Sequence, residues 1–489
     1  MKNGMIMAAA ALIMRAAGMG MRVWLSGRLG AEGMGVYQLT LSAYAFFALV
    51  CSSGVTVTVT RLVCELTERR SAPAAAYAAE KVMTASFVVS SLLAMCMFFS
   101  ADYIGIFLGS EQTVPAIRIL SPSLPLMSVS AAARGYFTAR RRIIAPTVEQ
   151  MIEQATEIAV CAAAFAMLPT HSTRRACAYA AAGTTASEAV SFVYILIVYA
   201  IDVRSFAKGR SREDGLVRRA LPIYLPCTAS SALRSLLAAV ENMLIPAGLV
   251  RGGTDSKTAL ARYGMISGMA MPVIGFPSFV ILPFATLMIT EMSSAKAGGR
   301  TLAVQRMAQR VVGVTLKYSV PVAMIMIFFS RQLSEALYGN SEVGLYIAAL
   351  APVVPLMYLD SAVDGMLKGL GEQTSYFVFN AVDSALRVVL MLLLVPVFGT
   401  WAVISVIILS ELFNTALSVW KLIKVSKMQA RPVSDMLLPC LCAAVPCMLF
   451  RFTGAAGKTS IIVTVLCCSA IYLFLLAIIK INSKKLLLK

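Results

Sequence analysis

The sequence is poor in the side chains with which most enzymes carry out chemistry. It contains one histidine, His171, and 24 acidic residues against 43 basic ones in 489 residues. It has no GxxxxGK(S/T) phosphate loop, no GxSxG nucleophile turn and no HExxH metal motif. Its 11 cysteines lie mostly in apolar segments, and no CxxC pair indicates a metal site. We therefore expect a protein that is not an enzyme and that holds no metal.

Long polar segments are also lacking. Hydrophobic residues make up 59% of the chain, whereas soluble domains usually have about 45–50%. Apolar runs of about 17–25 residues, enough to cross about 30 Å of hydrocarbon, follow one another without strand-like alternation. We expect an all-α polytopic membrane protein with about 14 transmembrane helices. The runs are 5–26, 36–60, 82–100, 114–137, 147–168, 176–201, 218–246, 264–290, 311–330, 344–366, 374–397, 400–420, 433–450 and 459–480.

The net charge of +19 does not indicate nucleic-acid binding, because the basic residues fall in alternate loops and not on one soluble face. The rule that cytoplasmic loops are positively charged places these loops inside the cell. The loop 102–113 has no lysine or arginine and falls on the other side. We expect a multi-pass protein of the bacterial cytoplasmic membrane with both termini in the cytoplasm. The basic loops comprise Lys2, 61–81, 140–142, 204–219, 296–310, Lys368, 421–431 and 480–489.

The segment 98–157 is repeated after a constant shift of 230 positions. The FFS that starts at Phe98 returns at Phe328, Gly109 returns as Gly339, and the run SPSLPLM returns as APVVPLM. Repeats of this kind indicate two similar halves with the functional site between them. Six helices per copy predict two lobes of the same orientation, and two helices are left over. The predicted domains are an N-lobe at 1–205, a C-lobe at 206–427 and a C-terminal helix pair at 428–489.

The first apolar run carries two arginines, Arg15 and Arg22. They lie on one face of a helix, because seven residues are close to two turns. The run is too long for a signal peptide, so we expect a retained first helix. Since an arginine at the centre of a membrane costs about 2.5–3.5 kcal/mol, both should face a watery cavity or an acidic partner.

Glu149, Glu153 and Glu157 follow one another at intervals of four residues, so a helix would align them in one stripe. One interpretation is that they neutralise Arg15, Arg22 or Arg134 in a structural ion-pair network. The other is that a cavity with exchangeable ion pairs takes a charged substrate.

The two halves match in position but not in charge, because the interior of the first half is richer in arginine. The shift of 230 places Arg134 on Asp364, and Arg15 falls near Glu241. Two faces of opposite charge would suit a pocket for a charged substrate, although local pairing also explains them. The second half has Asp360, Asp364, Asn380 and Asp383 on its expected tenth and eleventh helices.

Three stretches together resemble one family of membrane proteins. Arg15-x-x-Gly18-x-x-x-Arg22, GRLGAEGMGVYQ and RGYFTARRRIIAPTVEQMIEQ are similar to the stage V sporulation protein B group of polysaccharide exporters. That group belongs to the multidrug/oligosaccharidyl-lipid/polysaccharide exporter superfamily, which includes MATE-like transporters and the lipid II flippases. The resemblance implies two six-helix lobes around a central cavity that opens alternately to each side. In the flippases, helices 13 and 14 add a groove.

The resemblance also assigns roles to single residues. It places Arg15 and Arg22 at basic positions that line the flippase cavity, although the spacing to Arg22 is one residue longer than in the best-known members. Glu157 stands where a basic residue is expected. The predicted substrate-binding residues are Arg15, Arg22, Arg134, Glu153, Glu157 and Glu241, and the predicted ion-coupling residues are Asp360, Asp364, Asn380 and Asp383.

We therefore expect a flippase that moves a lipid-linked, diphosphate-bearing glycan precursor for cell-envelope, peptidoglycan or spore-wall synthesis. Its expected partners are that substrate, membrane lipids and glycan-assembly enzymes, without nucleic acid. No cofactor is expected apart from Na⁺ or H⁺ as a coupling ion. Two alternatives stay open, namely a drug/cation antiporter of the same fold and a membrane scaffold that transports nothing.

Overall fold

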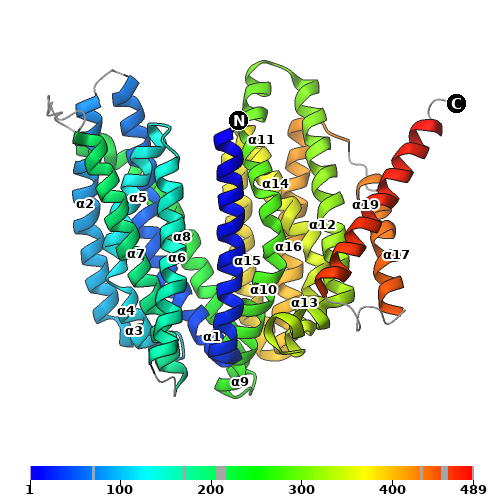
Figure 1. Ribbon diagram of the computed structural model, residues 1–489, viewed down its shortest axis with the longest axis horizontal. Coiled ribbons are helices and arrows are strands. Elements are labelled where there is room, and N and C mark those ends of the chain that lie inside the picture. The colour runs from blue at the N-terminus through cyan, green and yellow to red at the C-terminus, as the bar shows by residue number, and fades with distance from the viewer. Residues whose placement is uncertain are drawn as a thin grey trace. The chain divides into compact units, whose positions relative to one another are not determined.

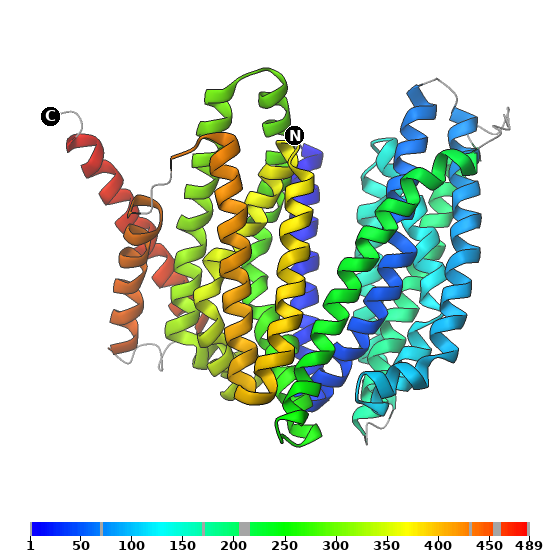
Figure 2. The same cartoon turned by 180° about the vertical axis from the view of Figure 1, so that it is seen from behind.

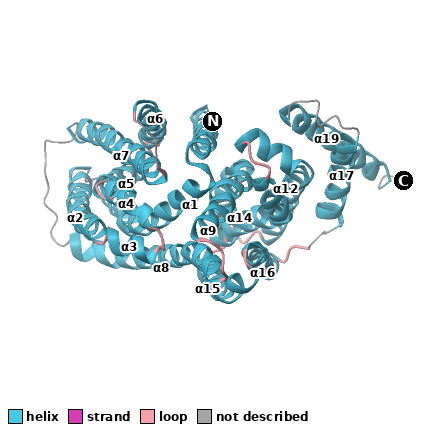
Figure 3. Ribbon diagram, turned by 90° about the horizontal axis from the view of Figure 1, so that it is seen from below, coloured by secondary structure: helices cyan, strands magenta, loops and turns pink. Residues whose placement is uncertain are grey.

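The protein was analysed as a computed structural model, which describes residues 2–68, 72–168, 172–204, 216–429, 433–452 and 461–486. Within these ranges the chain folds into helices joined by short turns and has no strand, as the colouring in Figure 3 shows. This agrees with the expected all-α class. Predictions made for His171 and for the basic link 205–215 lie outside the described residues.

Two compact units make up the chain, Met1–Gly264 and Met265–Lys489, called unit 1 and unit 2 below. The predicted domain boundaries at 205 and 427 stay a prediction. The helices of unit 1 (Figure 1) are α1 (Lys2–Glu68), α2 (Ala72–Phe99), α3 (Ala101–Phe107), α4 (Val114–Leu120), α5 (Ser123–Ala139), α6 (Ile144–Met167), α7 (Thr173–Arg204), α8 (Leu216–Arg251) and α9 (Ser256–Tyr263). Those of unit 2 are α10 (Met271–Gly275), α11 (Leu282–Ala297), α12 (Thr301–Tyr338), α13 (Glu342–Leu350), α14 (Val354–Gly369), α15 (Gln373–Phe398), α16 (Thr400–Ser426), α17 (Leu438–Phe452) and α19 (Ile461–Leu486).

The first helix, α1, contains the first two predicted apolar runs. Its 67 residues would measure about 100 Å at 1.5 Å per residue, far more than the roughly 30 Å of a hydrocarbon core. The backbone leaves the helical conformation at Gly30, with φ 68° and ψ −177°. Residues other than glycine rarely adopt this conformation. Gly30 therefore divides α1 into an N-terminal part with Arg15 and Arg22 and a C-terminal part that packs against α5 and α8.

Close contact with α1 holds α5 in the interior of unit 1. A Cβ atom on Gly135 would lie only 2.8 Å from the carbonyl oxygen of Thr56 on α1. Thr56 Oγ1 and Thr60 Oγ1 donate hydrogen bonds to the carbonyls of Ala131 and Gly135, each at 3.2 Å. The alanine-rich start of α2 packs into the same core. These contacts fix α5, and with it Arg134, beside α6 and α7.

Prolines break the helix at the start of unit 2 into short pieces. The segment 264–283 contains Pro272, Pro277 and Pro283, and it passes through a π-helical stretch, α10 and a 3-10 turn before α11. Three tyrosine hydroxyls donate to carbonyls of this segment: Tyr318 to Pro277 at 2.9 Å, Tyr338 to Met269 at 3.0 Å and Tyr358 to Ile274 at 2.7 Å. In a membrane, broken backbone needs such partners.

The last two helices, α17 and α19, pack against α12. Lys317 Nζ on α12 lies 2.9 Å from Asp435 Oδ1, in the turn that begins α17. Tyr472 Oη on α19 donates to the carbonyl oxygen of Lys317 at 2.6 Å. Figure 2 shows this pair from behind, in orange-red and red. The C-terminal pair is therefore anchored to unit 2 through one turn of α12.

The two copies of the repeat have the same backbone conformation at their corners. Gly109 and Gly339, which are 230 positions apart, have φ values of 69° and 62°. Arg141 and Gly371, also 230 positions apart, have φ values of 58° and 75°. Positive φ values at matching positions mean that the chain turns in the same way at these corners of both copies.

Among the described residues, ten helical segments are long and apolar enough to cross a membrane, and the bent pair Glu111–Leu120 and Ser123–Ala139 makes eleven if it forms one span. The chain is therefore a polytopic membrane protein. The predicted number of 14 crossings is not confirmed by this count. The count treats the two runs in α1 as one, and it omits α6, which carries three glutamates.

Candidate functional site

The predicted acidic stripe lies along α6. Its first member, Glu149, has a fully buried side chain, and Glu149 Oε1 lies 3.0 Å from Arg134 Nη1 on α5. The Arg134 side chain is 23% exposed, so the pair lies at the edge of the interior. The structure therefore contains an ion pair between Arg134 and the glutamate stripe, which is one of the pairings considered from the sequence.

The last member of the stripe, Glu157, is held by neutral partners. Thr184 Oγ1 on α7 donates to Glu157 Oε1 at 3.0 Å, and Gln154 Nε2 donates to Glu157 Oε2 at 3.3 Å. Arg22 is near enough to interact with Glu157 electrostatically, but the two form no ion pair within the described part of the chain. A Cβ atom on Gly18 would lie 3.3 Å from Gln154 Oε1, so α1 runs directly alongside the stripe.

Arg15 and Arg22 both have exposed side chains. Among the residues that the structure describes, neither guanidinium has an ion-pair partner. Since α1 passes α6 at Gly18, the two arginines flank the point where the helices meet. Their donors are therefore available to a ligand.

Glu188 on α7 is a member of the cluster that the sequence analysis missed. Its side chain is only 7% exposed, and Glu188 Oε2 has no hydrogen-bond partner among the described residues. Glu149, Glu153 and Glu157 on α6, together with Arg134, are near enough to interact with it electrostatically. No repeating spacing marks Glu188 in the sequence, because it is the one acid in the middle of α7.

Glu241, the remaining predicted binding residue of unit 1, lies on α8 and is half-buried. Its neighbour Asn242 donates from Nδ2 to Ser42 Oγ on α1 at 3.1 Å. The structure therefore places Glu241 on α8, next to a residue that contacts α1.

Unit 2 holds a second cluster of charged side chains. Asp383 on α15 is buried, lies 2.9 Å from Arg387 Nη2 one turn later, and accepts a hydrogen bond from Ser410 on α16. Arg387 Nε donates to the same serine oxygen at 2.9 Å. This predicted ion-coupling acid is therefore already part of an ion pair.

The other predicted ion-coupling residues are less fully occupied. Asn414 Nδ2 on α16 donates to Asp360 Oδ2 at 3.0 Å, and Asp364 Oδ1 has no hydrogen-bond partner among the described residues. Asn380 Nδ2 donates to the carbonyl oxygen of Tyr376 on its own helix. Glu411 on α16, which the sequence analysis did not select, interacts electrostatically with Asp360 and Asp383. The acids of unit 2 thus form one cluster, and Asn380 stays outside its hydrogen bonds.

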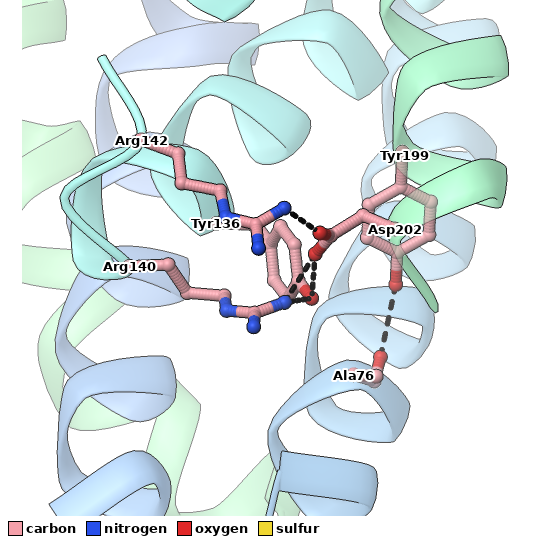
Figure 4. A network of polar contacts seen from close by, with 6 residues as sticks. All are labelled: Ala76, Tyr136, Arg140, Arg142, Tyr199 and Asp202. Atoms are coloured by element: carbon pink, nitrogen blue, oxygen red, sulfur yellow. Dashed lines mark hydrogen bonds and ion pairs between the residues drawn. The ribbon is translucent and has the colours of Figure 1, made fainter. Parts of the chain in front are cut away.

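A third network ties the end of α7 to the corner between α5 and α6 (Figure 4). Asp202 accepts hydrogen bonds from both Arg140 and Arg142, and Tyr136 Oη donates to Asp202 Oδ2 at 2.8 Å. The ring of Tyr199 meets that of Tyr136 edge-on, with centroids 5.0 Å apart. Its hydroxyl donates to the carbonyl oxygen of Ala76 on α2 at 3.0 Å. This network therefore joins the C-terminal end of α7 to α2, to α5 and to the corner between α5 and α6.

The chain is similar in sequence to proteins of Bacillus subtilis (strain 168). It is 20% identical to stage V sporulation protein B over 99% of this chain and 96% of that protein. It is 21% identical to sporulation protein YkvU over 73% of this chain and 79% of that protein.

Solved structures of transporters have the same fold. The inward closed conformation of lipid II flippase MurJ matches with a TM-score of 0.77 at 13% identity, over 98% of this chain and 99% of that one. The inward-facing conformation of a multidrug resistance MATE family transporter of the MOP superfamily matches with a TM-score of 0.66 at 14% identity, over 85% and 96%.

A family assignment follows from the sequence pattern. The pattern of the family described as "Polysaccharide biosynthesis protein" matches residues 1–290. This region covers more than half of the 489 residues and includes the whole of the α1, α5, α6 and α7 cluster. The chain belongs to the polysaccharide biosynthesis protein family.

Proposed function

We propose that this protein moves a lipid-linked glycan precursor with a diphosphate head across the bacterial cytoplasmic membrane by alternating access. The observation that carries the proposal is the pair of arginines on α1. Arg15 and Arg22 are exposed and lack ion-pair partners within the described part of the chain, although they lie in a helix of a membrane protein. Since intramembrane arginines are costly, their presence favours a role in binding.

The chemistry of the arginines fits a diphosphate. A guanidinium group donates two parallel hydrogen bonds to phosphate oxygens, and it stays charged at any physiological pH. The lipid tail of the substrate remains in the bilayer while its head crosses the polar interior. The likeness to a lipid II flippase and to a sporulation protein supports a substrate of cell-wall or spore-wall synthesis.

The proposed topology has 14 crossings, with both termini in the cytoplasm. An even number of crossings agrees with basic residues at both ends of the chain, at Lys2 and at 480–489. The two lobes are related by the internal repeat, and α17 and α19 form the added pair. Glycan-assembly enzymes are the proposed protein partners.

Transport needs an energy source, and we propose an ion gradient. The candidates are Na⁺ or H⁺ at the acids of unit 2. Asp360 and Asp364 support this proposal most directly, because the Oδ1 atom of each lacks a hydrogen-bond partner within the described residues. Asn380 and Asp383 complete the proposed set.

A flipping assay tests the proposal. The purified protein is placed in vesicles with a fluorescent lipid-linked sugar, and head-group accessibility to an added enzyme or quencher is followed over time. We expect protein-dependent movement of the head group. No difference from protein-free vesicles would overturn the proposal.

The drug/cation antiporter is the second candidate, and the glutamate cluster of unit 1 favours it. Four carboxylates gathered near α6 would attract a cationic compound more readily than a diphosphate. Uptake of a cationic dye into the same vesicles, with no movement of the lipid-linked sugar, would select the antiporter. No movement of either compound would select the scaffold.

A further inference from the structure

The glutamate cluster of unit 1 is defined by Glu149, Glu153 and Glu157 on α6 and Glu188 on α7. Glu149 pairs with the guanidinium of Arg134 at 3.0 Å, and Glu157 accepts hydrogen bonds from Thr184 and Gln154. Glu149 and Glu188 are both buried, and the Oε2 atom of each has no hydrogen-bond donor among the described residues, but only Glu149 has an ion-pair partner there. A buried carboxylate without a partner is costly.

The groups that face Glu188 do not compensate its charge. From α6 it meets Glu149, Glu153 and Glu157, and from α5 it meets Arg134, which is already paired. From α1 it meets Tyr44, whose hydroxyl is hydrogen-bonded to Ser123 Oγ at 2.8 Å. Four carboxylates therefore share one paired guanidinium, with Arg22 near Glu157 at the far end of the stripe.

We propose that Glu188 binds a proton and is the proton site of unit 1, distinct from the ion-coupling acids proposed for unit 2. Only the role of this proton site in a transport cycle rests on the proposed transport function. In the described conformation the carboxyl of Glu188 carries a proton taken from water. When that proton returns to water, an unpaired negative charge is left in the cluster.

The arrangement favours a proton over a metal ion. A proton needs one carboxyl oxygen, whereas Na⁺ or a divalent cation needs several oxygen ligands at once. Among the described residues, no group of three or more acidic, histidine or cysteine side chains is arranged to hold a metal ion. A single unpartnered oxygen at Glu188 meets the simpler requirement.

Loss of the proton would change how the helices pack. An ionised Glu188 would repel Glu153 and Glu157 and would compete with Glu149 for Arg134, since all of them interact electrostatically. The hydrogen bond from Thr184 to Glu157 joins α7 to α6, so repulsion between the two helices would weaken it. Proton release is therefore linked to rearrangement of α6 against α7.

Infrared difference spectroscopy tests the site without any transport assay. Full-length protein in lipid nanodiscs is titrated from acid to alkaline pH while the C=O band of protonated carboxyl groups is recorded. We expect the difference spectrum of wild type minus Glu188→Gln to contain a band that disappears as the pH rises. The Glu188→Asp protein should show the band at a shifted frequency, and Glu111→Gln, an exposed acid outside the cluster, should leave it unchanged.

The outcomes decide the proposal in each case. Glutamine resembles the neutral acid, so Glu188→Gln should fold, and a thermal melt checks this. Should it fail to fold, the Asp variant decides through the frequency of its band. An unchanged pH-dependent band in both variants would overturn the site.

In vesicles, Glu188→Gln should lose the response of transport to a pH gradient, and a full response would overturn the role in coupling. A wild-type protein that moves no lipid-linked sugar would refute the proposed function, and the infrared result would still stand.

Discussion

Glu157 on α6 and Arg387 on α15 occupy equivalent positions of the internal repeat, 230 residues apart, and carry opposite charges. In unit 2, Arg387 lies one turn after Asp383 and neutralises it at 2.9 Å. In unit 1, Glu157 lies one turn after Glu153 and adds a second negative charge. The same helix position therefore neutralises the neighbouring acid in unit 2 and adds to the negative charge in unit 1.

The pair of Arg134 and Glu149 should stabilise unit 1 only while both partners are present. Arg134→Ala leaves the fully buried Glu149 without a counter-charge, and we expect a loss of about 3–5 kcal/mol in the free energy of unfolding. The double variant Arg134→Met with Glu149→Leu should recover most of this loss. Unfolding in detergent with a chemical denaturant measures both.

The control is the exposed pair of Arg118 and Asp102, whose side chains are 43% and 61% exposed. Arg118→Ala should cost about 1 kcal/mol or less, because exposed ion pairs contribute little. A double variant at Arg134 and Glu149 that is no more stable than Arg134→Ala would contradict the pairing.

The network around Asp202 predicts a graded series. Tyr136→Phe removes one hydrogen bond to Asp202 and should cost about 0.5–1.5 kcal/mol. Asp202→Ala removes the acceptor of Arg140 and Arg142 as well, and charged hydrogen bonds are worth about 1.5–3 kcal/mol. Tyr199→Phe, which loses only a bond to a backbone carbonyl, is the matched control. Thermal melts of the three proteins should rank Asp202→Ala as the least stable, and any other order argues against the network.

Glu372 and Lys421 predict a dependence of stability on pH. Glu372, at the start of α15, accepts a hydrogen bond from Lys421 Nζ at 3.0 Å, and this bond lowers the pKa of the carboxyl below its usual value. A lowered pKa in the folded state gives stability that is complete above the pKa of the unfolded chain and is lost as the pH falls through that of the folded one. Glu372→Gln should flatten this acid-side decline by about 1 kcal/mol or less. The free energy of unfolding is measured at a series of acidic pH values, with Glu111→Gln as the control. The same pH dependence in both variants would refute the assignment.

Hydropathy and spacing predicted much of this structure, because they report on one helix at a time. The apolar runs predicted helices, and the interval of four residues predicted the stripe of Glu149, Glu153 and Glu157. The repeat of Gly109 at Gly339 predicted a corner whose backbone is alike in both copies. These features depend only on residues close in sequence or on a constant shift.

Contacts between helices could not be predicted in the same way. Glu188 belongs to the cluster because α7 turns it toward α6, and no neighbour in the sequence marks it. Asp202 meets Arg140 and Arg142 only after α6 and α7 have reversed the chain twice. The sequence offers many arginines and acids, and only tertiary packing decides which of them meet.

The acids of unit 2 predict the response to an ion gradient. Asp364→Asn and Asp383→Asn should remove the dependence of transport on a sodium or proton gradient, while binding of the lipid-linked sugar survives. Asp364→Asn is the cleaner variant, because Asp383→Asn also leaves Arg387 without its acid. Flipping assays under imposed gradients measure this. A normal response of both variants to both gradients would rule the assignment out.

Arg15 and Arg22 separate head-group binding from structural pairing. If they hold a diphosphate, Arg→Lys changes should impair transport, because lysine keeps the charge but loses the planar pair of donors. Abundance and thermal stability should barely change, since both side chains are exposed and have no ion-pair partner in the described residues.

If the two arginines instead serve to balance Glu153 or Glu157, lysine should serve nearly as well. Removing an arginine together with its partner acid should then restore what the single change lost, because no orphan charge remains. Transport and abundance are therefore measured for single and double neutral variants of these four residues. Full recovery of transport in a double variant would refute the substrate-binding role, and a loss that persists in every double variant would place the diphosphate on α1.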